Sequence, residues 1–263
     1  MEEILRLEHF SVSYDGRRAV VDDVSLQIGQ GEIVTIVGES GSGKSTLLHG
    51  IQGLLPSSAA TKGKVLLFGQ DLTKLDAAAR RKMRGEQISM IFQDTGRYMN
   101  PISRIGKQYT GFLKQHMHRP EDELLALERE MLRKVNLTDT ERVLSCYPFE
   151  LSGGMRQRVG IAMALSLKPK LLLADEPTSA LDVTVQAQVV KELAALCKKE
   201  GATIIMVTHN MGVAANISDR VGVMQNGRLS EWGTVTEVIR EPKESYTKSL
   251  LSSIVELSDP QLI

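Results

Sequence analysis

The chain has 263 residues, of which 42% are hydrophobic, and its 32 basic and 32 acidic side chains give a formal net charge of zero. This composition suffices for one large α/β domain or two small ones, and the neutral charge balance argues against binding of nucleic acid through a basic surface. The two cysteines, Cys146 and Cys197, have no metal-ligand spacing, which indicates a reducing compartment and no disulfide framework. No apolar run approaches the roughly 18 residues of a membrane span, and the acidic start Met1-Glu2-Glu3 lacks a signal-peptide pattern. We therefore expect a soluble, cytoplasmic chain that can dock on a membrane protein.

The N-terminal part of the chain is rich in strand patterns. Residues 4–14 and 20–28 alternate between apolar and polar side chains around the turn signal Asp15-Gly16, which predicts an antiparallel hairpin or meander. The apolar run 32–37 predicts a buried strand, and a helix is expected over 47–51. The further elements expected here are a strand over 63–69, a short basic helix over 75–83 and a strand over 88–92.

Between Asp94 and about Leu167 the strand patterns stop, and helical patterns follow over 103–116, 121–135 and 153–167. This change indicates a helical subdomain, about residues 94–167, inserted into an α/β core. The remaining elements expected are a strand over 170–174, a helix over 183–199, a strand over 202–208, a helix over 210–216 and a strand pair around the turn at 225–228. We expect one domain over residues 1–240 and a short C-terminal tail over 241–263.

The most informative segment is a complete phosphate-binding P-loop between the expected strand and helix, with the residues Gly38-Glu39-Ser40-Gly41-Ser42-Gly43-Lys44-Ser45-Thr46. Its glycines let consecutive backbone N–H groups turn around a polyphosphate, and the helix N-terminus adds partial positive charge. Lys44 can neutralise the β- and γ-phosphates, and the Ser45 hydroxyl can ligate Mg²⁺. The alternative is a glycine-rich turn that binds nothing.

A pair of carboxylates ends the apolar strand at 171–174. Asp175, at the C-terminal end of this strand, can hold Mg²⁺ through water, and Glu176 can polarise the attacking water. This motif is weak alone, because apolar strands often end in acidic residues. It gains weight because it follows a P-loop in the same chain.

A second anion site is indicated by Leu151-Ser152-Gly153-Gly154-Met155 at the start of an expected helix. Ser152 is a natural N-cap, and the two glycines leave the backbone N–H groups unobstructed. The alternative is an ordinary capped helix.

With these motifs the chain resembles the ATP-binding cassette (ABC) ATPases over nearly its whole length. Gln93 matches the Q-loop of that family, Ser179-Ala180-Leu181-Asp182 match the D-loop, and His209 matches the switch histidine. Tyr14 stands where the family stacks an aromatic ring on adenine; the alternative is a buried strand tyrosine. The residues and the resemblance together assign to catalysis Glu176, His209 and Gln93; to the nucleotide Tyr14, Gly38, Glu39, Ser40, Gly41, Ser42, Gly43, Lys44, Ser45, Thr46, Ser152, Gly153, Gly154 and Asp182; and to Mg²⁺ Ser45, Gln93 and, through water, Asp175.

The resemblance implies a specific architecture and cofactors. The expected fold is the α/β fold of P-loop NTPases: an ABC ATPase core with an antiparallel β-subdomain and a helical subdomain that carries the signature motif. The expected cofactors are ATP and Mg²⁺. In this family two ATPase domains pack head to tail, so that each nucleotide lies between one P-loop and the signature helix of the partner. Because this chain has one copy of each motif, the resemblance implies a second domain from another polypeptide.

Three substrings are similar to the peptide/nickel uptake branch of the family: 147–158, 180–188 and 99–108. That branch implies an importer of bacteria or archaea with two transmembrane permeases, two different ATPases and an extracytoplasmic solute-binding protein. The chain resembles the first ATPase of the pair, at the cytoplasmic face of the cell membrane. Nucleic acid is not expected as a partner.

The chain also departs from that branch. Glu244-Ser245-Tyr246-Thr247 stands where the branch often has His-Pro-Tyr-Thr, and no cysteine follows Cys197. These departures favour nickel, metal-chelate or dipeptide solutes over long oligopeptides. The alternative functions are a non-transport ABC ATPase that acts as an assembly factor in a soluble enzyme complex, and a nucleic-acid ATPase, which the neutral charge does not favour.

Overall fold

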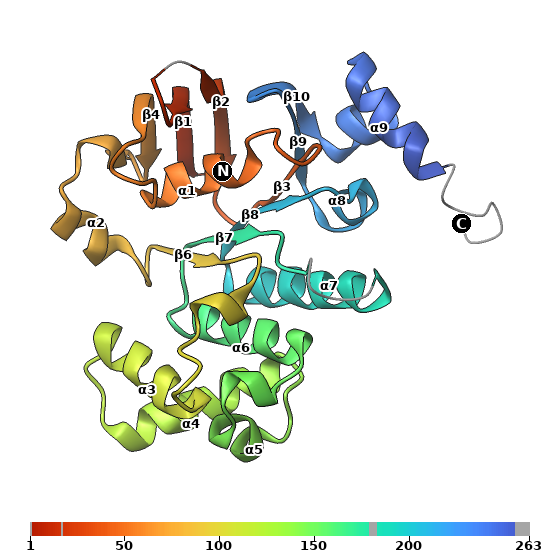
Figure 1. The fold of residues 1–263 in the computed structure, drawn as a ribbon. Coiled ribbons are helices and arrows are strands. Elements are labelled where there is room, and N and C mark those ends of the chain that lie inside the picture. The colour runs from red at the N-terminus through yellow and green to blue at the C-terminus, as the bar shows by residue number, and fades with distance from the viewer. Residues whose placement is uncertain (1, 17, 179–182, 256–263) are drawn as a thin grey trace. The chain divides into compact units, whose positions relative to one another are not determined.

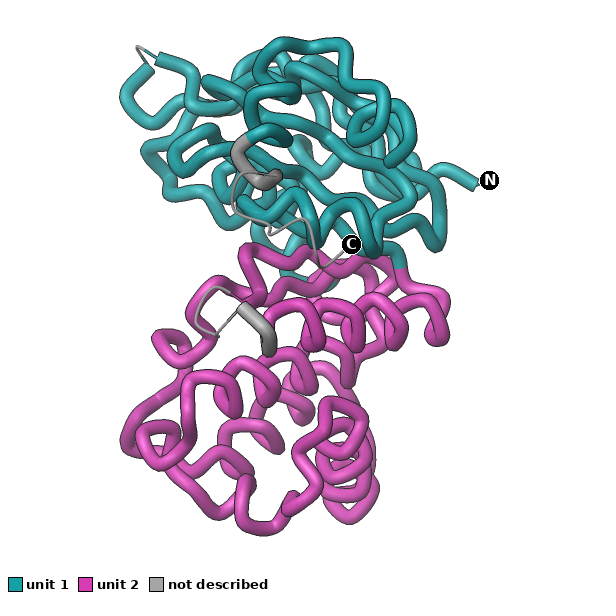
Figure 2. Tube along the Cα trace, turned by 90° about the vertical axis from the view of Figure 1, so that its right-hand side faces the viewer, with its two compact units in different colours: residues 1–82, 203–263 teal, residues 83–202 magenta. Residues whose placement is uncertain are grey.

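The computed structural model describes residues 2–16, 18–178 and 183–255, drawn as a ribbon in Figure 1. The chain divides into two compact units, coloured separately in Figure 2: unit 1 is Met1–Lys82 with Thr203–Ile263, and unit 2 is Met83–Ala202. Each unit carries part of the expected site residues.

Unit 1 contains an antiparallel sheet and a parallel strand group. The sheet has the strand order β2-β1-β4-β5, and its strands are β1 (Glu3–Ser13), β2 (Ala19–Gly29), β4 (Ala60–Leu67) and β5 (Gln70–Asp71). In the strand group, β3 (Ile33–Val37) is parallel to both β8 (Thr203–Thr208) and β9 (Arg220–Gln225), and β10 (Arg228–Thr234) is antiparallel to β9. The helical elements are η1 (Leu72–Lys74), α1 (Lys44–Gln52), α2 (Ala77–Met83, which ends across the boundary), α8 (Met211–Ile217), η4 (Thr236–Arg240) and α9 (Ser245–Val255).

The register of the parallel strands brings two site segments to one edge. Every residue of β3 is buried, as expected for a strand covered on both faces. Val37, its last residue, is paired with Thr208 of β8. Gly38 and His209 follow these two residues directly, so the P-loop and the expected switch histidine leave adjacent strands at the same edge.

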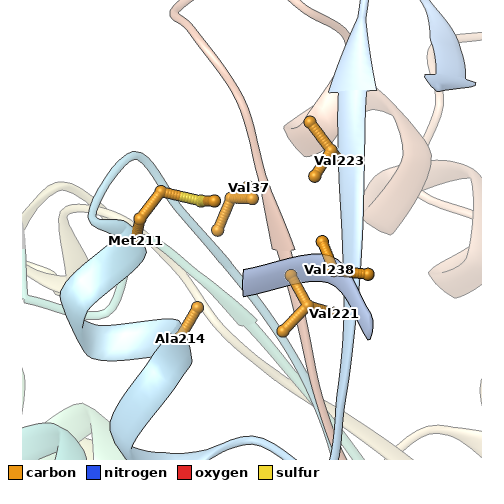
Figure 3. Packing of buried hydrophobic residues seen from close by; sticks show 6 residues of the cluster. All are labelled: Val37, Met211, Ala214, Val221, Val223 and Val238. Atoms are coloured by element: carbon orange, nitrogen blue, oxygen red, sulfur yellow. The ribbon is translucent and has the colours of Figure 1, made fainter. Parts of the chain in front are cut away.

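A hydrophobic cluster lies behind that edge (Figure 3). It consists of six buried side chains from β3, α8, β9 and η4: Val37, Met211, Ala214, Val221, Val223 and Val238. Side chains of α9 also pack against this cluster. The cluster therefore fixes the base of the P-loop, the start of α8 and the C-terminal helix to one another.

Unit 2 joins a short strand pair to a group of helices. The strands β6 (Ile88–Ile91) and β7 (Leu171–Asp175) are parallel, with Ile91 paired to Ala174. The helical elements are η2 (Thr95–Tyr98), α3 (Ile105–His116), α4 (Glu121–Lys134), α5 (Thr140–Ser145), η3 (Pro148–Glu150), α6 (Gly153–Ser166) and α7 (Val183–Glu200). Gln93 and Glu176 lie at the same offset beyond the paired ends of β6 and β7, which places them side by side.

The expected hairpin, strands and main helices are confirmed, with three differences. The strand expected over 63–69 runs from Ala60 to Leu67, and a turn occupies Phe68 and Gly69. α5 was not expected, and it is a six-residue helix capped by the Asp139 side chain. α9 lies within the segment that was expected to be a tail.

A buried carboxyl group lies between α3 and α4. Glu128 is 0% exposed, and its Oε2 atom has no hydrogen-bond partner among the described residues. The Thr110 hydroxyl lies 2.6 Å from Glu128 Oε1 and 2.9 Å from the Gly106 carbonyl oxygen. This hydroxyl has a single hydrogen, so both contacts are satisfied when a protonated Glu128 donates to Thr110 and Thr110 donates to Gly106. Burial raises the pKa of Glu128, which favours the same protonated form.

We expect Glu128→Gln to make the protein more stable at pH 7.5, by about 1 kcal/mol, because a neutral amide can donate to Thr110 without the free-energy cost of keeping a carboxyl group protonated at that pH. Because the folded-state pKa of Glu128 is raised, its stability contribution is fully present below the unfolded pKa and is lost as pH rises through the folded pKa. Urea unfolding between pH 4 and 8 measures this: the wild type should lose more stability over that range than Glu128→Gln. Glu130→Gln, at a carboxyl with 58% side-chain exposure on the same helix, is the control. Equal pH slopes for the wild type and Glu128→Gln would contradict the expectation.

Candidate active site

The P-loop between β3 and α1 requires glycine at two positions. Gly38 has a φ of +152°, and a Cβ atom there would lie 2.2 Å from the Met224 carbonyl oxygen. Gly43, the N-cap of α1, has a φ of +102°, and a Cβ atom there would lie 2.5 Å from the Val20 carbonyl oxygen. Both neighbours are backbone atoms that cannot rotate away, so a side chain at either position would displace the loop.

Lys44 is folded onto this loop. Its ammonium group donates to the carbonyl oxygens of Gly38 and Glu39, each at an N···O distance of 2.7 Å, and the residue is 5% exposed. Lys44 is also the first residue of α1, and Ser45 and Thr46 follow it in the first turn. The loop thus combines a cation, a helix N-terminus and hydroxyl groups within one short segment, which is an arrangement suited to a polyphosphate.

Tyr14 lies directly after β1 and is connected to the same segment. Its side chain is not buried, because the residue is 39% exposed, and this excludes a core tyrosine. The Tyr14 and Thr46 hydroxyl oxygens are 3.1 Å apart, a hydrogen-bond distance. The ring is therefore accessible to a ligand. Its hydroxyl is linked by this hydrogen bond to the first turn of α1, which directly follows the P-loop glycines.

His209 stands between β8 and α8 and is exposed. The next residue, Asn210, caps α8: its side-chain oxygen accepts from the Val213 N–H at 3.1 Å. The cap fixes the point where α8 begins. The backbone of His209, between the end of β8 and this cap, is therefore held at a defined position.

Gln93 and Glu176 form a direct contact in unit 2. The Gln93 side-chain amide donates to Glu176 Oε2 at 3.0 Å. Asp175, the last residue of β7, is 4% exposed. Glu176 has a φ of +40°, a left-handed conformation that costs a non-glycine residue about 1–3 kcal/mol and often marks functional sites. The Gln93 contact fixes the direction of the Glu176 carboxylate, an arrangement that suits a base.

The signature helix α6 begins as expected. The Ser152 hydroxyl oxygen accepts from the Met155 N–H at 3.2 Å and so caps the helix, which runs for 14 residues. Ser152 is exposed, and Gly153 and Gly154 form the first turn. The expected helix start is confirmed, and its N-terminus is open to an anionic group.

Sequence reasoning gave no role to Gln157, which joins α6 to the Q-loop. The residue is 2% exposed, and its amide donates to the Phe92 carbonyl oxygen at 3.1 Å and accepts from the Thr95 N–H at 3.4 Å. Gly160 allows this close approach, because a Cβ atom there would lie 2.3 Å from the Thr95 methyl carbon. Gln157 thus holds the residues on both sides of Gln93 against the signature helix. Its only sequence signal was its place just after the signature motif.

The D-loop residues 179–182, including Asp182, lie outside the described residues. The other expected site residues fall into two sets. Unit 1 carries Tyr14, the P-loop and His209, and unit 2 carries Gln93, Ser152, Gly153, Gly154, Asp175 and Glu176.

The donor groups fit a magnesium nucleotide. The glycine positions of the P-loop leave a cradle that a Cβ atom would fill, and Lys44 places an ammonium group against it. In unit 1 the Ser45 hydroxyl offers an oxygen atom, the kind of ligand that Mg²⁺ prefers when phosphates complete its coordination. In unit 2 the Gln93 amide and the Asp175 carboxylate offer oxygen atoms of the same kind. The P-loop and its lysine define a nucleotide-binding protein.

Comparison with known proteins extends this assignment. The family model described as ABC transporter matches residues 21–179, and the chain belongs to this family. The oligopeptide transport ATP-binding protein OppD of Bacillus subtilis is 41% identical over 259 residues, which cover 97% of this chain and 72% of OppD. The dipeptide transport ATP-binding protein DppD of Haemophilus influenzae is 40% identical, over 97% of this chain and 79% of DppD.

Among solved structures, the dimeric post-hydrolysis state of the ATP-binding cassette MJ0796 bound to ADP and Pi has a TM-score of 0.78 and 29% identity, and it covers 88% of this chain and 99% of that one. The predicted family and fold class are confirmed: this is an ABC ATPase with an antiparallel β-sheet and a helical region. The chain is a nucleotide-binding ATPase coupled to transport.

Proposed function

We propose that this chain hydrolyses ATP to drive the uptake of dipeptides or oligopeptides through a membrane complex. The observation that carries this proposal is similarity to peptide transport ATP-binding proteins along 97% of the chain. Transported solute does not need to touch this subunit, so the choice among peptides rests with other subunits. The nickel and metal-chelate solutes that the sequence favoured are not supported by these two relatives, which are both named for peptides.

The residues of unit 1 bind the nucleotide in this proposal. Tyr14 offers its ring face to adenine, the P-loop N–H groups surround the phosphates, and Lys44 neutralises the β- and γ-phosphate charge. His209 hydrogen-bonds the γ-phosphate. The exposed ring of Tyr14 and the placement of Lys44 on the loop support these roles.

The residues of unit 2 act on the γ-phosphate and on water. Gln93 and, through water, Asp175 would be ligands of Mg²⁺, as would Ser45 of unit 1. The ion would supply positive charge that offsets the charge developing during phosphoryl transfer. Glu176 accepts a proton from the attacking water as this water bonds to the γ-phosphorus and the bond to the β,γ-bridging oxygen breaks, so that ADP and phosphate are the products. The contact between Gln93 and Glu176 supports a shared task, because the amide orients the carboxylate that must receive the proton.

The signature helix acts on a nucleotide bound to a second ATPase. Ser152, Gly153 and Gly154 offer an open, capped helix start without a lysine, which suits the γ-phosphate of a nucleotide held by another P-loop. The MJ0796 cassette, similar over 88% of this chain, is described as a dimer. We propose that the partner is a second, non-identical ATPase, and that Asp182 acts across the interface with it. ATP then favours the closed pair, because only there are both anion sites satisfied.

Exposed apolar side chains in unit 2 support a contact with membrane subunits. Tyr98, Ile102 and Phe149 are 65%, 84% and 70% exposed, all within or beside the helical segment 94–150. The Tyr98 ring stacks on Phe92 with ring centroids 4.2 Å apart, and Gln93 is the next residue. Exposed large apolar groups commonly mark interaction sites. A permease that contacts Tyr98 would therefore contact the ring that stacks on Phe92, the residue directly before Gln93.

None of the helices among the described residues is long and apolar enough to cross a membrane. We propose that the chain is peripheral and lies at the cytoplasmic face, bound to two transmembrane permeases. An extracytoplasmic binding protein would deliver the solute to them.

Affinity purification of the tagged chain from native membranes tests this proposal. We expect four further kinds of subunit: a second ABC ATPase, two proteins with multiple membrane spans and an associated peptide-binding protein. Crosslinks to the permeases should map to residues 94–150, and crosslinks confined to exposed residues outside that segment would contradict this contact. Recovery with soluble enzymes only would favour the assembly-factor alternative instead.

A further inference from the structure

The C-terminal helix α9 contacts the base of the P-loop. Its residues Tyr246, Leu250 and Leu251 pack against the cluster shown in Figure 3. That cluster includes Val37, the residue directly before the P-loop, and Met211, the first residue of α8. Packing therefore fixes α9 on the strand end from which the loop emerges.

Tyr246 also reaches the loop itself. Its hydroxyl oxygen accepts a hydrogen bond from the Glu39 backbone N–H at an N···O distance of 3.2 Å, across 207 residues of sequence. The same peptide unit is held at its other end, where the Gly38 carbonyl oxygen accepts from the Lys44 ammonium group at 2.7 Å. The Gly38–Glu39 peptide bond is trans, so its C=O and N–H point in opposite directions. Tyr246 and Lys44 thus hold one peptide plane from two sides.

We propose that Tyr246 is a positioning residue for nucleotide binding: its hydroxyl fixes the Gly38–Glu39 peptide, and this peptide fixes the amine of Lys44. Without the hydroxyl, the Gly38–Glu39 peptide keeps its contact with Lys44 but loses the restraint on its N–H, so the Gly38 carbonyl oxygen is held less firmly in its direction toward Lys44. Lys44 then samples more positions, and binding of phosphate must order it again. This inference rests on nucleotide binding at the P-loop and goes beyond the proposed function, which gives α9 no role.

Glycine gives the P-loop backbone flexibility that a distant contact can reduce. Gly38 at a φ of +152° lies in a region that only glycine occupies readily, and the loop in front of α1 has no side-chain cap at Gly43. The Tyr246 contact adds, from a distant part of the chain, a restraint on the Glu39 N–H to those that Lys44 makes on the loop carbonyls.

The neighbouring Thr247 provides a matched control. It is 0% exposed, and its hydroxyl oxygen has no hydrogen-bond partner among the residues that the structure describes. Thr247→Val therefore removes a hydroxyl from the same helix without removing a contact to the P-loop. Tyr246→Phe keeps the ring that packs on the cluster and removes only the hydroxyl.

The first measurement is equilibrium binding of ATP to the purified full chain, with Mg²⁺ withheld to prevent turnover. Tyr246→Phe should weaken ATP binding about two- to tenfold, the fold-change that corresponds to the net value of one hydrogen bond. Its thermal midpoint without nucleotide should stay within about 4 °C of the wild-type value, the shift expected for the loss of one hydrogen bond in a chain of this size. Thr247→Val should keep wild-type affinity.

The second measurement is steady-state ATPase in the assembled complex. A positioning role raises the KM for ATP in Tyr246→Phe and leaves kcat near the wild-type value. If Tyr246 has a structural role only, less of the variant is folded, so the maximal rate falls while KM for ATP stays unchanged. Wild-type ATP affinity in Tyr246→Phe, or equal losses of affinity in Tyr246→Phe and Thr247→Val, would overturn the inference.

Lys44→Ala in the same binding assay separates two kinds of failure. If Lys44→Ala weakens ATP binding and Tyr246→Phe does not, only the role of Tyr246 is wrong. If Lys44→Ala also binds ATP normally, the assignment of the P-loop as the nucleotide site fails with it.

Discussion

Glu176→Gln should bind ATP with wild-type affinity and hydrolyse it at least about 100-fold more slowly, the lower range of what a positioned base contributes. Glutamine has the shape of glutamate and can still accept the hydrogen bond from the Gln93 amide through its own side-chain oxygen. The substitution therefore leaves the local geometry in place and removes the group that accepts a proton from water.

The slow variant should also accumulate in the ATP-bound, associated state. Hydrolysis is the step that releases the partner ATPase in this account, so a chain that binds but cannot hydrolyse stays paired. Size-exclusion chromatography of this variant with its partner, with and without MgATP, measures the effect. Glu123→Gln, at an exposed carboxylate in the first turn of α4, is the control and should hydrolyse normally. Near-normal ATPase in Glu176→Gln would remove Glu176 from the catalytic role.

Lys44→Ala should weaken ATP binding by about 10- to 100-fold, the range for hydrogen bonds to a charged group. Lys44 is the only residue with a full positive charge between Gly38 and Thr46, and its ammonium group lies against the loop backbone. Removing it leaves the phosphate charge to the backbone N–H groups and the helix N-terminus, which carry only partial charges.

Isothermal titration of the isolated chain with ATP measures this loss. Lys62→Ala, at an exposed lysine of β4 in the same unit, tests for a general effect of lost charge and should bind as the wild type does. If Lys44→Ala keeps its affinity for ATP, Lys44 does not contact the phosphates. Compared with Glu176→Gln, this variant separates loss of binding from loss of chemistry.

Local patterns were sufficient to predict the elements that carry the motifs. The strand before the P-loop is a continuous apolar run, and α6 begins at a serine cap followed by two glycines. Both signals lie within a few residues of the element that they define, so the sequence alone predicts the segments that begin at Gly38 and Gly153. The confirmed hairpin of β1 and β2 has the same origin, in the alternation of its side chains.

Features that depend on distant contacts could not be predicted in this way. The hydrogen bond between Gln93 and Glu176 joins residues 83 positions apart and depends on the register of β6 with β7. The role of Gln157 depends on the approach of η2 to α6, which no local pattern encodes. α5 is too short for a clear helical period, and α9 gains its place from packing on a cluster made by four other elements.

The central claim is that the helix start at Ser152 serves a nucleotide held by another chain. Ser152→Arg tests it most directly, because the larger side chain would occupy the space in front of the exposed helix N-terminus without touching the P-loop sequence. ATP binding by the isolated chain should stay within about twofold of wild type, and ATPase of the assembled complex should fall at least about tenfold, as expected when an oriented charge-binding group is blocked. Loss of ATP binding by the isolated chain, or normal ATPase in the complex, would contradict the account.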